Sequence, residues 1–147
     1  MAKVAVDRKL QEFSIASTAG PPWCPGDGAG KKLVIYFYPR DNTPGCTQEG
    51  QDFRDLTAQF RRAGALIFGV SPDSIESHQK FRAKMKFPFD LLSDESKAVA
   101  LAYGAVDDLE AKTAKRISYL IGPDGKIKKA YATVKAADHP EQVLGDL

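Results

Sequence analysis

The sequence has few of the residues that build metal sites and disulfide frameworks. Its 147 residues include two cysteines and two histidines. A metal site needs several ligands that converge, and His78 and His139 are far apart with no second ligand near either in sequence. We therefore expect no metal and no cofactor. Without a secretion signal, two cysteines favour a reducing compartment, where a thiol is more often catalytic than part of a structural disulfide.

Long apolar runs and an excess of one charge are also absent. No stretch approaches the roughly 18 apolar residues of a membrane span, and residues 1–10 carry charges instead of a signal peptide's apolar segment. The 21 basic and 19 acidic residues leave a net charge of +2. The densest basic cluster, Lys126, Lys128 and Lys129, is typical of a solvated strand edge rather than a nucleic-acid surface. We expect a cytoplasmic protein with no membrane or nucleic-acid partner.

Common catalytic motifs are missing as well. The sequence has no glycine-rich phosphate loop and no Ser-His-Asp arrangement in a usable context. The run Trp23-Cys24-Pro25-Gly26 has one cysteine, whereas the thioredoxin motif has a Cys-x-x-Cys pair. Its resemblance to thioredoxin is therefore weak.

What the sequence does contain is an alternation of buried strands and amphipathic helices. Its length and its 43% hydrophobic content fit one domain over residues 1–147. We predict strands over 12–16, 33–38, 65–70, 89–92, 116–121 and 126–133, and an exposed loop over 20–28. We predict helices over 44–63, 74–86 and 139–147, and a further helix that Ser93 or Asp94 caps and that ends at 103–104. This alternation predicts an α/β fold with a central mixed β-sheet flanked by helices on both faces.

Cys46 lies where a strand pattern ends and a helical pattern begins. The N-terminus of a helix carries partial positive charge and unpaired N–H donors, and both stabilise a thiolate. Cys46, Phe53 and Phe60 recur at spacings of seven, so the thiol shares the core-facing side of the helix. A cysteine on an apolar helix face is by itself more often a small core residue. Its place at the helix start makes Cys46 the best candidate nucleophile.

The residues around Cys46 form a more specific pattern. The run from Pro39 to Glu49 contains Pro, three residues, Thr, two residues and Cys, which resembles the active-site pattern of peroxiredoxins. Residues 36–39, 52–55, 91–94 and 116–121 are similar to the branch called bacterioferritin comigratory protein or peroxiredoxin Q. The resemblance implies a thioredoxin-like fold and an antioxidant enzyme. Such an enzyme reduces hydrogen peroxide and organic hydroperoxides through a cysteine sulfenic acid.

The same resemblance implies the site residues. Cys46 is then the peroxidatic cysteine, Thr43 and Arg116 complete the site, and Pro39 shields it. A hydroxyl both donates and accepts, so Thr43 suits contact with the thiol and with a peroxide. Arg116 supplies a permanent positive charge that favours the thiolate. Pro39 can line the pocket without competing for hydrogen bonds, because it has no backbone N–H. Glu49, one turn past Cys46, could orient an arginine. Taken alone, Thr43 fits an N-cap and Arg116 a surface ion pair.

The chain departs from many relatives where they carry a resolving cysteine. Gln51 stands five residues after Cys46, and the helix predicted over 74–86 has no cysteine. Cys24 is the candidate resolving residue, or else an incidental exposed thiol. We favour a one-cysteine mechanism recycled by thioredoxin, glutaredoxin or a low-molecular-weight thiol, in a monomer or weak dimer. The alternative function is a thioredoxin-like thiol–disulfide oxidoreductase or binding protein without peroxidase activity, against which the missing Cys-x-x-Cys argues.

Overall fold

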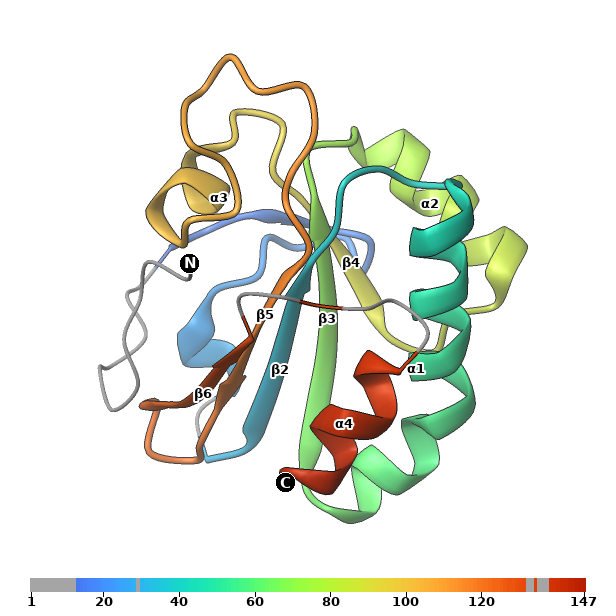
Figure 1. Ribbon diagram of the computed structural model, residues 1–147, viewed down its shortest axis with the longest axis vertical. Helices are drawn as coiled ribbons and strands as arrows, with labels where there is room; N and C mark the ends of the chain where they lie inside the picture. The colour runs from blue at the N-terminus through green and yellow to red at the C-terminus, as the bar shows by residue number, and fades with distance from the viewer. Residues whose placement is uncertain (1–12, 29, 132–133, 135–137) are drawn as a thin grey trace.

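A mixed β-sheet forms the centre of the structure, which is a computed structural model describing residues 13–28, 30–131, 134 and 138–147 (Figure 1). The strands are β1 (Ala16–Ser17), β2 (Lys32–Phe37), β3 (Ala65–Ser71), β4 (Asp90–Ser93), β5 (Ile117–Ile121) and β6 (Ile127–Tyr131). In the described part of the chain they pair in the order β1-β4-β3-β2-β5-β6. The pairs β2–β3 and β3–β4 are parallel, and the other pairs are antiparallel. The predicted mixed sheet is therefore confirmed.

Helices cover both faces of this sheet (Figure 1). One face carries the helices α1 (Pro44–Arg62), α2 (Ile75–Met85) and α4 (His139–Gly145). The other face carries the short helix α3 (Ala98–Ala102) and the segment that leads into the turn η1 (Pro25–Gly28). Among the helices of the described residues, none has the length and apolar character needed to cross a membrane.

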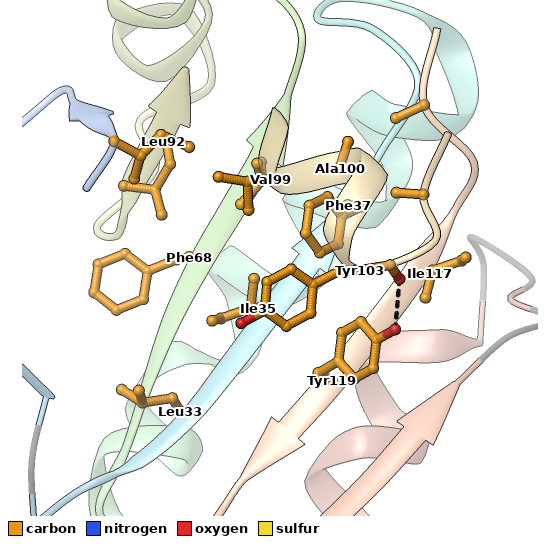
Figure 2. Packing of buried hydrophobic residues seen from close by; sticks show 14 of the residues in the cluster. Leu33, Ile35, Phe37, Phe68, Leu92, Val99, Ala100, Tyr103, Ile117 and Tyr119 are labelled. Carbon is orange, nitrogen blue, oxygen red and sulfur yellow. Dashed lines mark hydrogen bonds between the residues drawn. The ribbon is translucent and has the colours of Figure 1, made fainter. Parts of the chain in front are cut away.

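Alternating side chains of β2 divide the interior into two cores. Leu33, Ile35 and Phe37 belong to the core under α3, whereas Val34 and Tyr36 belong to the core under α1. The α3-side core further includes Trp23, Phe68, Leu92, Val99, Ala100, Tyr103, Ile117 and Tyr119. Figure 2 shows this core, in which the Tyr119 hydroxyl donates to the Tyr103 carbonyl at 2.6 Å. The α1-side core further includes Cys46, Phe53, Phe60, Phe81, Phe87, Phe89, Leu91 and Val143.

Helix α1 agrees with its prediction at both ends. It begins at Pro44, whose fixed φ suits the first turn, and it ends at Arg62 in a basic last turn that complements the helix dipole. The predicted core stripe is also confirmed, because Cys46, Phe53 and Phe60 are 2%, 0% and 0% exposed. The candidate nucleophile is thus held in the α1-side core rather than on a free surface.

The prediction of an exposed loop over 20–28 is partly wrong. Trp23 is only 9% exposed and Pro25 is buried. The backbone of Trp23 exchanges two hydrogen bonds with Ile15, at 2.8 and 3.0 Å, and its ring centroid lies 4.5 Å from that of Phe68. Burial of an indole removes a large apolar area from water. That gain outweighs the turn preferences of the surrounding prolines and glycines.

Other element bounds also differ from prediction. The first strand is β1 (Ala16–Ser17) and not 12–16. Residue 12 of that prediction, and residues 132 and 133 of the predicted last strand, lie outside the described residues. Helix α3 is capped by Asp94, whose carboxylate accepts from the N–H groups of Val99 at 3.3 Å and Ala100 at 2.7 Å. The predicted capping role of Asp94 is therefore confirmed, although the helix itself begins later.

Candidate active site

The sheet register brings together residues that are distant in sequence. Strand β2 ends at Phe37, and the chain then turns through the loop 38–43 into α1. Antiparallel pairing places Ile117 of β5 opposite Phe37. Arg116, which precedes Ile117, is therefore held beside the start of α1. The pairing of two buried strands thus delivers a charged side chain to the first turn that contains Cys46.

Arg116 contacts two acidic groups of α1 with two different nitrogens. Its Nη2 donates to Cys46 Sγ at 3.4 Å, and its Nη1 donates to Glu49 Oε1 at 2.6 Å. The Arg116 side chain is 17% exposed and that of Glu49 is 0% exposed. The planar fork of a guanidinium can satisfy two such partners at once. The predicted convergence of Arg116 on Cys46 and Glu49 is found in the structure.

Glu49 is a buried acid with an incomplete set of partners. Its Oε1 binds Arg116, while its Oε2 is buried without a hydrogen-bond partner among the described residues. Burial raises the pKa of Glu49 to about 7, against the opposing attraction of Arg116. Glu49 therefore carries a proton for part of the neutral pH range. When Glu49 is protonated, the Arg116 charge attracts Cys46 without competition from a second negative charge.

Thr43 and Pro39 frame the same turn from the loop. Thr43 is the N-cap residue of α1, with φ −84° and ψ 156°, but its side chain does not bind the first-turn N–H groups. Its hydroxyl instead donates to the Arg40 carbonyl at 3.1 Å. The hydroxyl proton is then engaged, and the oxygen remains an acceptor. Pro39 is half-buried at the start of this loop.

A buried polar cluster behind the loop was missed in the sequence. No second ligand is expected near His78 from its place in the sequence, but its Nδ1 lies 2.7 Å from Asp41 Oδ2. One ligand atom from each of Asp41, Asp73 and His78 lies within 4.8 Å of the others. The 2.7 Å contact is a hydrogen-bond distance, so these two side chains bind each other directly. The predicted strand order could have indicated this cluster, because the loops that follow the parallel neighbours β2 and β3 lie at the same edge of the sheet.

The second histidine lies on the other side of the Arg116 ion pair. His139 is 1% exposed at the start of α4, and its Nε2 lies 2.8 Å from Ser118 Oγ. Burial lowers the pKa of His139 to about 4, and the charge of Arg116 adds to the effect. His139 is therefore neutral near pH 7 and belongs to the packing under the site.

Cys24 lies apart from this constellation. It follows Trp23, whose ring packs in the α3-side core, whereas Cys46 belongs to the α1-side core on the opposite face of the sheet. The Cys24 thiol is half-buried, and it contacts Asp27 Oδ2 at 3.4 Å, to which its backbone N–H also donates at 3.1 Å. The structure thus brings Arg116 to Cys46, with Thr43 as the N-cap of the same helix and Pro39 in the loop before it, whereas Cys24 lies elsewhere.

Known proteins with this sequence pattern identify the family. A sequence model of the AhpC/TSA family matches residues 6–130. A putative peroxiredoxin Bcp of Coxiella burnetii is 37% identical over 149 residues, which cover 98% of this chain and 99% of the relative. The chain belongs to the peroxiredoxins. Peroxiredoxin Bcp of Xanthomonas campestris is 44% identical over 124 residues, covering 81% of this chain and 78% of the relative.

Solved peroxiredoxin structures show the same fold. Xanthomonas campestris peroxiredoxin Q superposes with a TM-score of 0.85 at 39% identity, covering 91% of this chain and 88% of that one. Xylella fastidiosa PrxQ superposes with a TM-score of 0.91 at 33% identity, covering 97% and 94%. The predicted thioredoxin-like fold and the bacterioferritin comigratory branch are confirmed. As a member of this branch, the chain is a thiol-dependent peroxidase, with a peroxide as substrate and a thiol as reductant.

Proposed function

We propose that Cys46 is the peroxidatic nucleophile of this peroxiredoxin, with Arg116, Thr43 and Pro39 forming its pocket. The observation that carries the proposal is the 3.4 Å contact from Arg116 Nη2 to Cys46 Sγ in the first turn of a 19-residue helix. A cationic neighbour and a helix N-terminus are the surroundings that make a thiol reactive as its thiolate.

The reaction uses one pair of electrons from sulfur. The Cys46 thiolate attacks the terminal oxygen of hydrogen peroxide or of an organic hydroperoxide. A sulfur–oxygen bond forms as the oxygen–oxygen bond breaks, and the leaving oxygen takes a proton to depart as water or an alcohol. Cys46 becomes a sulfenic acid. An activity of this kind, alkyl peroxide reduction, is described for the Xanthomonas campestris bacterioferritin comigratory protein.

Each pocket residue has a role that follows from its contacts. Because the Thr43 hydroxyl donates to the Arg40 carbonyl, its oxygen is left as an acceptor for the peroxide O–H. The guanidinium of Arg116 stabilises charge that develops on the leaving oxygen. Pro39 offers no N–H that would compete for the substrate. Since Cys46 is only 2% exposed, the reacting end of the peroxide must be slender.

An external thiol recycles the sulfenic acid in this proposal. A disulfide requires two Cα atoms within about 7 Å, and the neighbour of Cys24, Trp23, is anchored in the core on the opposite sheet face. The external thiol attacks the Cys46 sulfur, releases water and leaves a mixed disulfide, which a second thiol then reduces. Thioredoxin, glutaredoxin or a low-molecular-weight thiol can fill this role. The monomer or weak dimer and the cytoplasmic location stay predictions.

Two cysteine variants test the proposal. Peroxide consumption in the presence of a thiol should vanish in Cys46→Ser and persist in the matched variant Cys24→Ser. Peptide mapping after one equivalent of peroxide should find a sulfenate or a mixed disulfide on Cys46. Undiminished turnover in Cys46→Ser would refute the nucleophile, and a dominant Cys24–Cys46 cross-linked peptide would refute the external resolution.

A further inference from the structure

A buried polar pair holds the active-site loop from behind. Asp41 lies in the loop between Pro39 and Thr43 and is 7% exposed, and His78 on α2 is 0% exposed. Their side chains meet at 2.7 Å, from His78 Nδ1 to Asp41 Oδ2. Neither residue takes part in the chemistry assigned to Cys46. The pair connects the loop that carries two pocket residues to a neighbouring helix.

Hydrogen bonds engage both ring nitrogens of His78. Its Nε2 lies 2.9 Å from the Leu92 carbonyl, which only accepts, so Nε2 carries a proton. Its Nδ1 faces a carboxylate that also accepts from the hydroxyls of Tyr38 at 2.6 Å and Ser77 at 2.8 Å. The Asp41 carboxylate thus has three hydrogen-bonding neighbours, and His78 links it to the Leu92 carbonyl of β4.

Further contacts show that α2 and its surroundings set the shape of this loop. The N–H of Asp41 donates to the Asp73 carboxylate at 2.7 Å, and Lys84 Nζ of α2 donates to Asn42 Oδ1 at 3.0 Å. Asn42 has a φ of +67°, in the left-handed region that few residues other than glycine adopt. Such a conformation persists only where the surrounding structure enforces it. The next residue along the chain is Thr43.

We propose that Asp41 and His78 are positioning residues for peroxide reduction. Their buried hydrogen bond fixes the loop and thereby places the Thr43 hydroxyl and the Pro39 wall over Cys46. The proposal rests on the role proposed above for Cys46. Removal of one partner leaves the other polar group buried without its hydrogen bond, so either single substitution releases the loop. A displacement of about 1 Å in a reacting group can lower a rate by roughly a hundredfold.

The test compares two reactions of the same thiol. Oxidation of Cys46 by peroxide needs the pocket, whereas alkylation of Cys46 by a small neutral reagent needs only the thiolate. Both rates are measured on the full chain, well below its melting temperature, in Asp41→Asn, His78→Gln and the double variant. The matched control is Ile127→Ala, which truncates a fully buried side chain of the β5–β6 hairpin, in the α3-side core. It destabilises the fold without touching the loop.

The expected result is a selective loss of oxidation. Peroxide oxidation should slow by roughly tenfold or more in each single variant, whereas alkylation should stay within about threefold of the parent. The double variant should be no slower than the slower single variant, because both act through one contact. Ile127→Ala should leave both rates unchanged.

Several outcomes would overturn the proposal. Oxidation at the parent rate in folded Asp41→Asn or His78→Gln would do so, and so would an equal fall in oxidation and alkylation. If those variants do not fold, Lys84→Ala removes only the exposed contact to Asn42, and it should slow oxidation by about threefold. No slowing there would overturn the proposal as well. Persistent peroxide consumption in Cys46→Ser would instead refute the proposed nucleophile, whatever the Asp41 variants do.

Discussion

Because of the buried acid Glu49, the unfolding free energy of this protein should fall as the pH rises from 4.5 to about 7. Its side chain is 0% exposed, and burial raises its pKa from 4.5 to about 7 despite the 2.6 Å contact to Arg116. Between these two values the unfolded chain ionises Glu49 while the folded chain keeps it protonated. Ionisation therefore favours the unfolded state across that interval.

The size of the effect follows from the two pKa values of Glu49. The pKa rises from 4.5 to about 7 on folding, and each pH unit of that interval costs about 1.4 kcal/mol of unfolding free energy. The folded state should therefore lose about 3 kcal/mol of unfolding free energy as the pH rises across that interval. Below 4.5 the carboxyl is protonated in both states, and above about 7 it is ionised in both, so the loss is confined to that window.

Urea unfolding at several pH values, with and without Glu49→Gln, measures this loss. Cys46→Ser serves as the background for both proteins, because it removes the titration of the neighbouring thiol. His139 titrates equally in both proteins, so its contribution cancels in the difference. The difference in unfolding free energy should change by about 3 kcal/mol across the window. Parallel curves would show that Arg116 keeps Glu49 ionised throughout, and they would refute the reasoning.

Substitutions at three further positions have expected outcomes. Gly50→Ala should destabilise the fold by about 1 to 3 kcal/mol in urea unfolding, because the added Cβ meets the Phe87 ring, with Cε1 at 3.0 Å; the exposed helix variant Ala58→Gly is its control. As the pH falls from 6.5 towards about 4, His139 takes up a proton in the unfolded chain but not in the folded chain, so the unfolding free energy falls. In His139→Gln this fall should be smaller by about 2 kcal/mol. Arg116→Lys should slow peroxide oxidation by roughly tenfold, and Arg116→Ala by more, because one ammonium cannot bind Cys46 and Glu49 as two guanidinium nitrogens do. These expectations would be contradicted in turn by a more stable Gly50→Ala, by a His139→Gln variant that loses as much stability in acid as the parent, or by an Arg116→Lys variant that is oxidised at the parent rate.

The long elements could be predicted because their patterns are uninterrupted. Strand β2 is a continuous apolar and aromatic run, and α1 repeats its core residues at helical spacing between a proline and a glycine. The segment around Trp23 could not be predicted in this way. Local turn chemistry correctly indicated an irregular backbone, but only the tertiary contact with Phe68 determines that the indole is buried. Gly50 is a similar case, since its sequence suggests a weak helix whereas the structure shows close approach of Phe87.

The active site could likewise be predicted from the sequence only in part. Thr43 and Cys46 are close in sequence and belong to one motif, so their proximity followed from the chain itself. Arg116 was assigned by resemblance, and its place depends on the pairing of β5 with β2. His78 was dismissed because its partner Asp41 lies 37 residues away. Contacts between a loop and a helix that packs on it have no periodic signature in sequence, so this pair could be found only from the fold.

The two buried pairs beside Cys46 differ in how fully their carboxylate oxygens are engaged. The Asp41 carboxylate accepts from Tyr38 and Ser77 and contacts His78, so both of its oxygens are engaged. Glu49 has one oxygen on Arg116 and the other without a partner, so its charge, when present, competes directly with the thiolate for the same guanidinium. The first pair is thus suited to fixing the geometry of the loop. The second couples the electrostatics of Cys46 to the proton on Glu49, and peroxide oxidation should therefore depend on pH through Glu49.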